Sequence, residues 1–294
     1  PHALLTCSRQ GEAKVWDLRT GSAERTLQCD PETGEEEALT CSIGAHDTAA
    51  AVAFGHKLHI WDVASSQRKG VYEGGHADVI NYVRFHATAP QLLLSGGDDS
   101  LVCLTDTSKS ALDDSYLQSV INTGDNVRFF SVVGPAQDML FSVSMTEAVS
   151  LWGFGAGVED VAMECSRFDT IREMPELLVE DSGGYAVEML YDSVACRMFV
   201  LAGSAAGSLV LLHAAPTELT RAAQFHSDPS RGHSGVVRSA LSLGKRLVTC
   251  GEDGRVCVWE QRAGDGPVEL MSNSYAEVYS KAPQGGRAAR AAPY

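Results

Sequence analysis

The side chains that could act in catalysis do not form a complete active-site pattern. Ser66 and Lys69 have the S-x-x-K spacing of a serine acyl-enzyme, but the further motifs that such enzymes need do not accompany them. The sequence also lacks an H-E-x-x-H metal motif, a G-x-S-x-G nucleophile elbow and a glycine-rich phosphate loop. We therefore expect no enzymatic activity and no small-molecule substrate.

The residues that could bind a metal are scattered as well. The eight cysteines stand singly and form no C-x-x-C pair, so neither a zinc site nor a thioredoxin-like motif is indicated. The acidic run at 30–37 has the wrong ligand order for a calcium loop, and Pro31 stiffens it. We expect no metal and no cofactor, and we interpret the cysteines as small buried hydrophobic side chains in a reducing compartment.

One group of polar residues does have the spacing of a hydrogen-bonded network. It consists of His233, Thr249, Asp253 and Trp259, in which an imidazole can bridge a carboxylate and a hydroxyl while the indole N–H closes the chain. A weaker copy consists of His76, Ser95 and Asp99. Because a buried polar group without a partner costs roughly 1 to 3 kcal/mol, we interpret both sets as structural. His59 has no such partners in the sequence, so we expect its replacement by Ala to do little.

These networks belong to a unit that recurs along the chain as a strand, a tight polar turn and a second strand. The residue near the end of the second strand falls at positions 16, 61, 105, 152, 212 and 259. Spacings of 44 to 60 residues between these positions are typical of the four-stranded blade of a β-propeller. The sequence therefore predicts an all-β propeller.

The motifs inside the units resemble those of the WD-repeat β-propeller family. The resemblance is carried by Trp16-Asp17, Trp61-Asp62, Gly75-His76, Gly232-His233 and the turn aspartates, and it covers about residues 4–271. The runs 75–86 and 232–239 are most similar to the WD repeat-containing protein 89 group. The family implies a closed ring of seven blades, whereas the first unit here begins at its second strand. We expect five full blades and a partial first blade, with seven blades in the intact protein.

The remaining sequence is assigned around this propeller. We predict a propeller over residues 1–280, with a helical insertion at about 153–183 because 168–174 has helical spacing before Pro175. A flexible basic tail follows at 281–294. The charge of 23 minus 38, or −15, argues against nucleic-acid binding by the body of the protein. The longest apolar run, 49–54, cannot cross a membrane, and we expect an intracellular protein of the cytoplasm, the nucleus or both.

The resemblance also implies a face for partners. WD-repeat proteins usually bind other proteins where the Gly-His loops and the tight turns emerge. Carried over position by position, the candidates beside the turn aspartate are Arg9, Asp98 and Glu252, and those five residues after the histidine are Asn81 and Arg238. Glu35, Glu36 and Glu37 would attract a basic partner. The predicted function is a non-enzymatic protein-interaction scaffold, and the resemblance suggests a link to growth or ribosome assembly.

A second function is left open by Trp16-Asp17-Leu18-Arg19. This W-D-x-R sequence resembles the docking motif of propellers that serve as substrate receptors for cullin-4 ubiquitin ligases. The resemblance gives Trp16, Asp17 and Arg19 the role of contacting the ligase adaptor. The other units do not repeat the motif, since Ala64 stands where the arginine would be in the second unit. The sequence leaves the oligomeric state open.

Overall fold

The structure is a computed structural model. It describes residues 3–28, 37–44, 47–134, 137, 139–153, 163–168, 184–192, 197–215, 218–226, 232–243, 246–261 and 269–272. Glu35, Glu36 and the basic tail at 281–294 lie outside these residues. Within them, no helix has the length and apolar character needed to cross a membrane.

The described strands form consecutive antiparallel sheets, each built from neighbours in the sequence. The first sheet has three strands, β1 (Ala3–Cys7), β2 (Glu12–Asp17) and β3 (Ser22–Gln28). The next two have four each: β4 (Ala38–Gly44), β5 (Ala49–Phe54), β6 (Lys57–Asp62) and β7 (Arg68–Tyr72), then β8 (Ile80–Phe85), β9 (Leu92–Gly97), β10 (Leu101–Asp106) and β11 (Leu117–Asn122). A short 3-10 helix, η2 (Asp114–Tyr116), precedes β11.

The second half of the chain repeats the four-stranded pattern. The fourth sheet contains β12 (Val127–Val133), β13 (Met139–Ser144), β14 (Val149–Gly153) and β15 (Met163–Phe168), and the fifth contains β16 (Gly184–Asp192), β17 (Arg197–Ser204), β18 (Leu209–Ala214) and β19 (Leu219–His226). The last contains β20 (Val237–Leu243), β21 (Arg246–Gly251), β22 (Val256–Gln261) and β23 (Glu269–Ser272). Because β23 also pairs in parallel with β19, the last two blades are joined into one eight-stranded hydrogen-bonded sheet.

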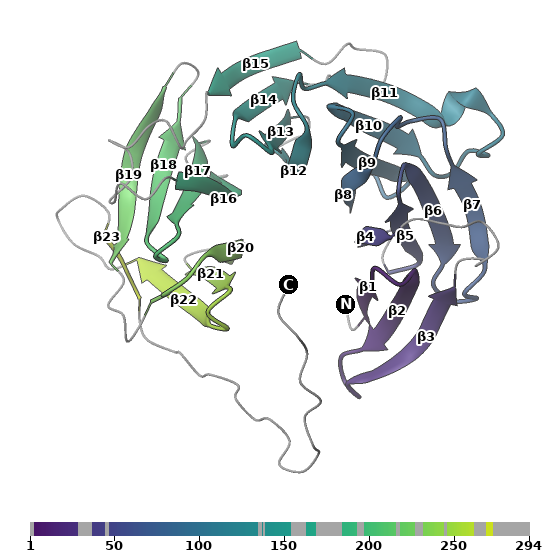
Figure 1. Cartoon of the computed structure of the whole chain (residues 1–294), viewed down its shortest axis with the longest axis horizontal. Coiled ribbons are helices and arrows are strands. Elements are labelled where there is room, and N and C mark those ends of the chain that lie inside the picture. The colour runs from purple at the N-terminus through teal and green to yellow at the C-terminus, as the bar shows by residue number, and fades with distance from the viewer. Residues whose placement is uncertain are drawn as a thin grey trace.

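The sheets stand as blades around an open centre (Figure 1), with the first strand of each four-stranded blade innermost. The first and last blades leave a gap between them in the same view. The predicted all-β propeller of five four-stranded blades and a three-stranded first blade is confirmed. A ring of seven blades in the intact protein stays a prediction.

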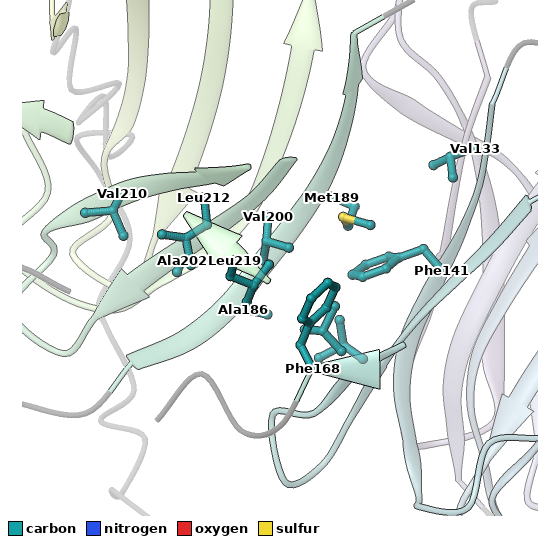
Figure 2. Packing of buried hydrophobic residues seen from close by; sticks show 12 residues of the cluster. Val133, Phe141, Phe168, Ala186, Met189, Val200, Ala202, Val210, Leu212 and Leu219 are labelled. Atoms are coloured by element: carbon teal, nitrogen blue, oxygen red, sulfur yellow. The ribbon is translucent and has the colours of Figure 1, made fainter. Parts of the chain in front are cut away.

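The blades are held to one another by apolar side chains from facing sheets. Between the fourth and fifth blades the cluster includes Phe141, Phe168, Met189 and Leu212, each less than a tenth exposed, and Figure 2 shows these side chains close together. Leu212 stands where other blades carry Trp and is 0% exposed. Each fully buried side chain of this size stabilises the fold by roughly 1.5 to 3 kcal/mol, so packing replaces the missing indole.

The insertion predicted at about 153–183 needs a correction. Residues 163–168 form β15, the fourth strand of its blade, which pairs antiparallel with β14 from Val149 to Gly153. An unpaired β14 would expose its backbone N–H and C=O groups along a sheet edge, so the blade takes its fourth strand from the following residues. Phe168 therefore ends a strand instead of starting a helix. Residues 169–183 lie outside the described part of the chain.

One close contact between blades yields a prediction. Gly207, in the turn between β17 and β18, has φ +90°, and a Cβ there would lie 2.5 Å from the carbonyl oxygen of His233 in the next blade. Gly21 has φ +66° with nothing within 4 Å. We expect Gly21→Ala to cost only the backbone strain of roughly 1 to 2 kcal/mol. Gly207→Ala should cost roughly 1 to 3 kcal/mol more, because the backbone of the next blade must move.

Urea unfolding of the two variants measures this difference directly. Equal losses for Gly207→Ala and Gly21→Ala would show that the fifth and sixth blades do not meet at this turn.

Candidate functional site

The last blade contains the predicted network of His233, Thr249, Asp253 and Trp259. The His233 Nδ1 atom lies 3.1 Å from an oxygen of Asp253, and its Nε2 atom lies 2.8 Å from the Thr249 hydroxyl. The Trp259 indole donates to the same hydroxyl over 2.8 Å. A carboxylate only accepts, so Nδ1 carries the proton and Nε2 accepts from Thr249. The imidazole, hydroxyl and indole are at most 2% exposed, which makes the network part of the interior and not a reactive site.

The third blade repeats the network without the indole. The His76 Nδ1 atom lies 3.0 Å from Asp99, and its Nε2 atom lies 2.8 Å from the Ser95 hydroxyl. Thr105 occupies the Trp position and is 1% exposed. Three of the four groups thus retain the same geometry.

The two turn aspartates also bind the backbone on both sides of them. Asp253 accepts from the amides of Ser234 and Arg255 at 2.8 and 3.1 Å, and Asp99 accepts from the amides of Ala77 and Leu101 at 3.0 and 3.1 Å. Burial acts to raise the pKa of Asp253, but the two amides and His233 outweigh it and the pKa is lowered. The carboxylate stays charged at neutral pH and fixes the Gly-His loop to the turn.

A hydroxyl under the indole recurs in blades that lack the histidine. The Trp16 indole donates to Thr6 over 2.8 Å, and the Trp152 indole donates to Ser142 over 3.1 Å. The hydroxyl residue precedes the tryptophan by ten positions, as Thr249 precedes Trp259. The sequence contains this spacing, and it could have revealed both pairs.

The expectation for His59 is wrong. The side chain is 0% exposed, and its ring lies 4.9 Å from the ring of Phe54 and 5.6 Å from that of Trp61. All the central residues of β6 are buried, so strand alternation gives no solvent face on which a polar residue could lie. Replacement by Ala would leave a cavity in the core.

The Gly-His loops and the turns after β9 and β21 lie at the same end of their blades, because the turn aspartates hydrogen-bond to both. We call this end the loop face. The predicted partner-binding residues pair with one another there. Arg238 donates from Nε to Glu252 over 2.8 Å, with side chains 63% and 50% exposed. Arg9 lies 3.2 Å from Glu37, with side chains 76% and 54% exposed.

The corresponding pair in the third blade is more enclosed. Asn81 donates from Nδ2 to Asp98 over 2.6 Å and to the carbonyl of Val127 in the next blade over 3.0 Å. Its amide therefore links two blades. The predicted residues at this face whose charged side chains are at least half exposed are Arg9, Glu37, Arg238 and Glu252.

A second hydrogen-bonded link between blades was not predicted from the sequence. Arg128 donates to Glu147 over 2.9 Å and to the carbonyl of Ala186 in the next blade over 2.5 Å, while Glu147 accepts from the amide of Ala186 over 2.8 Å. Glu147 is only 5% exposed. Arg128 precedes Trp152 by the same 24 residues that separate Asn81 from Thr105, so the repeat phase could have identified it.

The cysteines are not all inert. Burial raises the pKa of Cys103 to about 12 and that of Cys257 to about 11. The neighbouring thiol of Cys41 lowers the pKa of Cys7 to about 7, and Cys7 in turn raises the pKa of Cys41. The sequence places these two residues 34 positions apart, which hides their contact. Among the described residues, no group of three His, Cys, Asp or Glu side chains could hold a metal ion.

The W-D-x-R residues also come together. Arg19 donates two hydrogen bonds to the carboxylate of Asp17, from Nε to Oδ1 over 3.0 Å and from Nη2 to Oδ2 over 2.6 Å. These hydrogen bonds and the charge of Asp17 raise the pKa of Arg19. Asp17 is 5% exposed, whereas the Arg19 side chain is 67% exposed. The turn between β2 and β3 lies at the opposite end of the blade from the loop face, since the strands are antiparallel.

The buried network leads to a prediction. His233→Ala should destabilise the protein by roughly 1 to 3 kcal/mol, because Asp253 and Thr249 lose a buried partner. His56→Ala is the control, since His56 is half-buried in the turn between β5 and β6. Urea unfolding of both variants gives the comparison. If the two substitutions cost the same, the His233 network does not hold the loop face.

Comparisons with known proteins agree with this architecture. Residues 225–260 match the family described as WD domain, G-beta repeat. The chain is 27% identical to WD repeat-containing protein GTS1 of Arabidopsis thaliana over 100% of its length and 75% of that protein. It is 22% identical to the WD repeat-containing protein 89 homolog of Dictyostelium discoideum, covering 88% of this chain and 68% of the relative.

Solved structures show the same fold. The structure of U3-55K aligns with a TM-score of 0.61 at 14% identity, over 92% of this chain and 77% of the other. A chain of the mitotic checkpoint complex aligns with a TM-score of 0.64 at 15% identity, over 89% of this chain and 72% of the other. Together with the blades, the Gly-His loops and the turn aspartates, the family match and the two relatives support a WD-repeat family for this chain.

Proposed function

We propose that this chain is a non-enzymatic scaffold that binds protein partners on its loop face. The observation that carries the proposal is the contrast at this face between fixed loops and exposed charges. The carboxylates of Asp99 and Asp253 hold the loops in place. Arg238 and Glu252 form an ion pair in which the side chains are 63% and 50% exposed.

The exposed pair contributes little to the fold. Surface ion pairs contribute roughly 0 to 1 kcal/mol to stability, so Arg238 and Glu252 can exchange their mutual contact for contacts with a partner. Such charges at the rim of an interface mainly set specificity and association rate. A chain of the same fold is present in the solved structure of the mitotic checkpoint complex, which agrees with a role in protein assembly.

The charge of the chain indicates the chemistry of the partner. A net charge of −15, with Glu37 exposed at the loop face beside Glu35 and Glu36 in the sequence, favours a basic partner and accelerates its approach. Growth or ribosome assembly is the finer proposal, and similarity to the WD repeat-containing protein 89 homolog is its support. An intracellular location in the cytoplasm or nucleus agrees with the singly placed cysteines.

Two ion pairs on the last blade provide a matched test. Arg238→Ala with Glu252→Ala removes the pair at the loop face, and Arg246→Ala with Glu260→Ala removes an exposed pair at the opposite end. We expect the first double variant to lose most of the partners captured from native extract and identified by mass spectrometry. The second should retain them, because the two pairs have similar exposure and differ in position. Equal capture by both double variants would contradict the proposed face.

A second candidate function is supported by the exposed guanidinium of Arg19. Its two-point contact with Asp17 holds it in one orientation while leaving the side chain 67% exposed. An arginine held in this way can present its remaining donors to an acidic surface. This geometry suits a receptor that docks on the adaptor of a cullin-4 ubiquitin ligase, with the loop face left for the substrate.

Arg19→Ala separates the two functions. If the chain is a ligase receptor, this variant should lose the ligase adaptor from the captured proteins and keep the partners of the loop face. Arg197→Ala, an exposed arginine of the fifth blade, serves as the control. Capture of no adaptor by the unchanged protein, with every partner kept by Arg19→Ala, would end the receptor hypothesis.

A further inference from the structure

A cavity of about 260 Å³ lies between the inner strands of four blades. Its wall contains Tyr82 of β8, Arg128 and Phe129 of β12, Tyr185 and Glu188 of β16, and Arg238 of β20. These strands surround the centre of the ring in Figure 1. Most of the lining residues stand near the start of their strands, directly after the loops, so the cavity lies at the loop-face end of the centre.

Glu188 is the charged group of this wall with the fewest partners. Its carboxylate accepts one hydrogen bond, from the amide of Met189 over 3.1 Å, and it forms no ion pair with any residue that the structure describes. Burial raises the pKa of Glu188, although the amide of Met189 and the charge of Arg84 act against this rise. A half-buried carboxylate with one donor retains several unused acceptor positions.

The neighbouring arginines are bound elsewhere. Arg128 donates to Glu147 and to the carbonyl of Ala186, and Arg238 donates to Glu252. Arg84 donates to the Ser131 hydroxyl over 3.0 Å. Arg128 and Arg238 are therefore directed toward other carboxylates. The charge of Arg84 still acts on Glu188, and the unused acceptor positions of Glu188 are the ones left to receive a ligand.

Two tyrosines belong to the same cavity wall as this carboxylate. The Tyr185 hydroxyl accepts from the amide of Val237 over 2.7 Å, which fixes its ring between the fifth and sixth blades. The ring of Tyr82 packs edge-on against Phe130 at 5.1 Å. Aromatic faces attract organic cations, and the attraction is stronger where water is partly excluded.

We propose that this cavity binds the side chain of a lysine or arginine from an extended basic segment of a protein partner. Glu188 would bind the charged end, and Tyr82 and Tyr185 would contact the stem and the cation. The inference rests on the proposed scaffold function and names the class of side chain that it recognises. The net charge of −15 supports it, because a basic segment is drawn toward the loop face before it enters the cavity.

Peptide binding by the full chain tests this proposal. Three fluorescein-labelled nonapeptides of glycine and serine are compared by anisotropy, carrying three arginines, three lysines or three glutamates. We expect the arginine or lysine peptide to bind and the glutamate peptide not to bind. Glu188→Gln should raise the Kd of the basic peptide about tenfold, since the neutral amide keeps the shape and loses the charge. Glu218→Gln, on an exposed residue of the same blade, should leave the Kd unchanged.

Thermal unfolding of the same variants distinguishes binding from structure. Because Glu188→Gln removes a desolvated charge, its Tm should not fall, whereas a structural role predicts a lower Tm. Tyr82→Leu provides a second, uncharged variant and should also weaken the basic peptide. An unchanged Kd in both variants, a lower Tm for Glu188→Gln, or tighter binding of the glutamate peptide would overturn the proposal.

The outcome is separable from that of the scaffold function. If removing the Arg238–Glu252 pair leaves all partners in place while Glu188→Gln weakens the basic peptide, the loop-face proposal fails and the cavity remains. If partners are lost on removing the pair but Glu188→Gln leaves the Kd of the basic peptide unchanged, only the cavity proposal fails.

Discussion

The carboxylates of Asp99 and Asp253 provide the constraint on which the loop face depends. Each accepts from an imidazole, from an amide of the Gly-His loop and from an amide of the turn, so three separate segments meet at one charge. Their side chains are 8% and 6% exposed, and a buried carboxylate without these donors would be strongly unfavourable. The positions of the loops are thus set by the hydrogen bonds that each buried carboxylate requires, more than by the types of residue in the loops.

The inner strands extend this order from one blade to the next. Asn81 and Arg128 stand at equivalent positions, and each donates to a backbone carbonyl near the start of the following inner strand, Val127 and Ala186 respectively. In the fifth blade Val187 stands there, and Tyr185 takes over the link by accepting from the amide of Val237. The loop face is therefore continuous across the third to sixth blades. The cavity beside Glu188 forms where this chain of links changes from the side chains of Asn81 and Arg128 to that of Tyr185.

The sequence predicts the features that repeat and misses those that depend on distant contacts. The strands, the His233 and His76 networks and the partial first blade follow from motifs in phase. The strand at 163–168 was missed because the sequence assigned these residues to an insertion after the blade, while the unpaired edge of β14 decides their conformation. His59 was misread because β6 is buried on both faces. The Cys7–Cys41 contact and the cavity join strands from different blades, and no local pattern records them.

The account claims that partners bind where the turn aspartates fix the loops. Hydrogen–deuterium exchange of the full chain, with and without a captured partner, tests this most directly. We expect the backbone amides at 76–81, 97–101, 232–238 and 251–255 to exchange more slowly when the partner is bound, and those at 17–22, at the other end of the blades, to be unchanged. Slower exchange confined to Asp17–Ser22 and to the turn before Arg246 would contradict it.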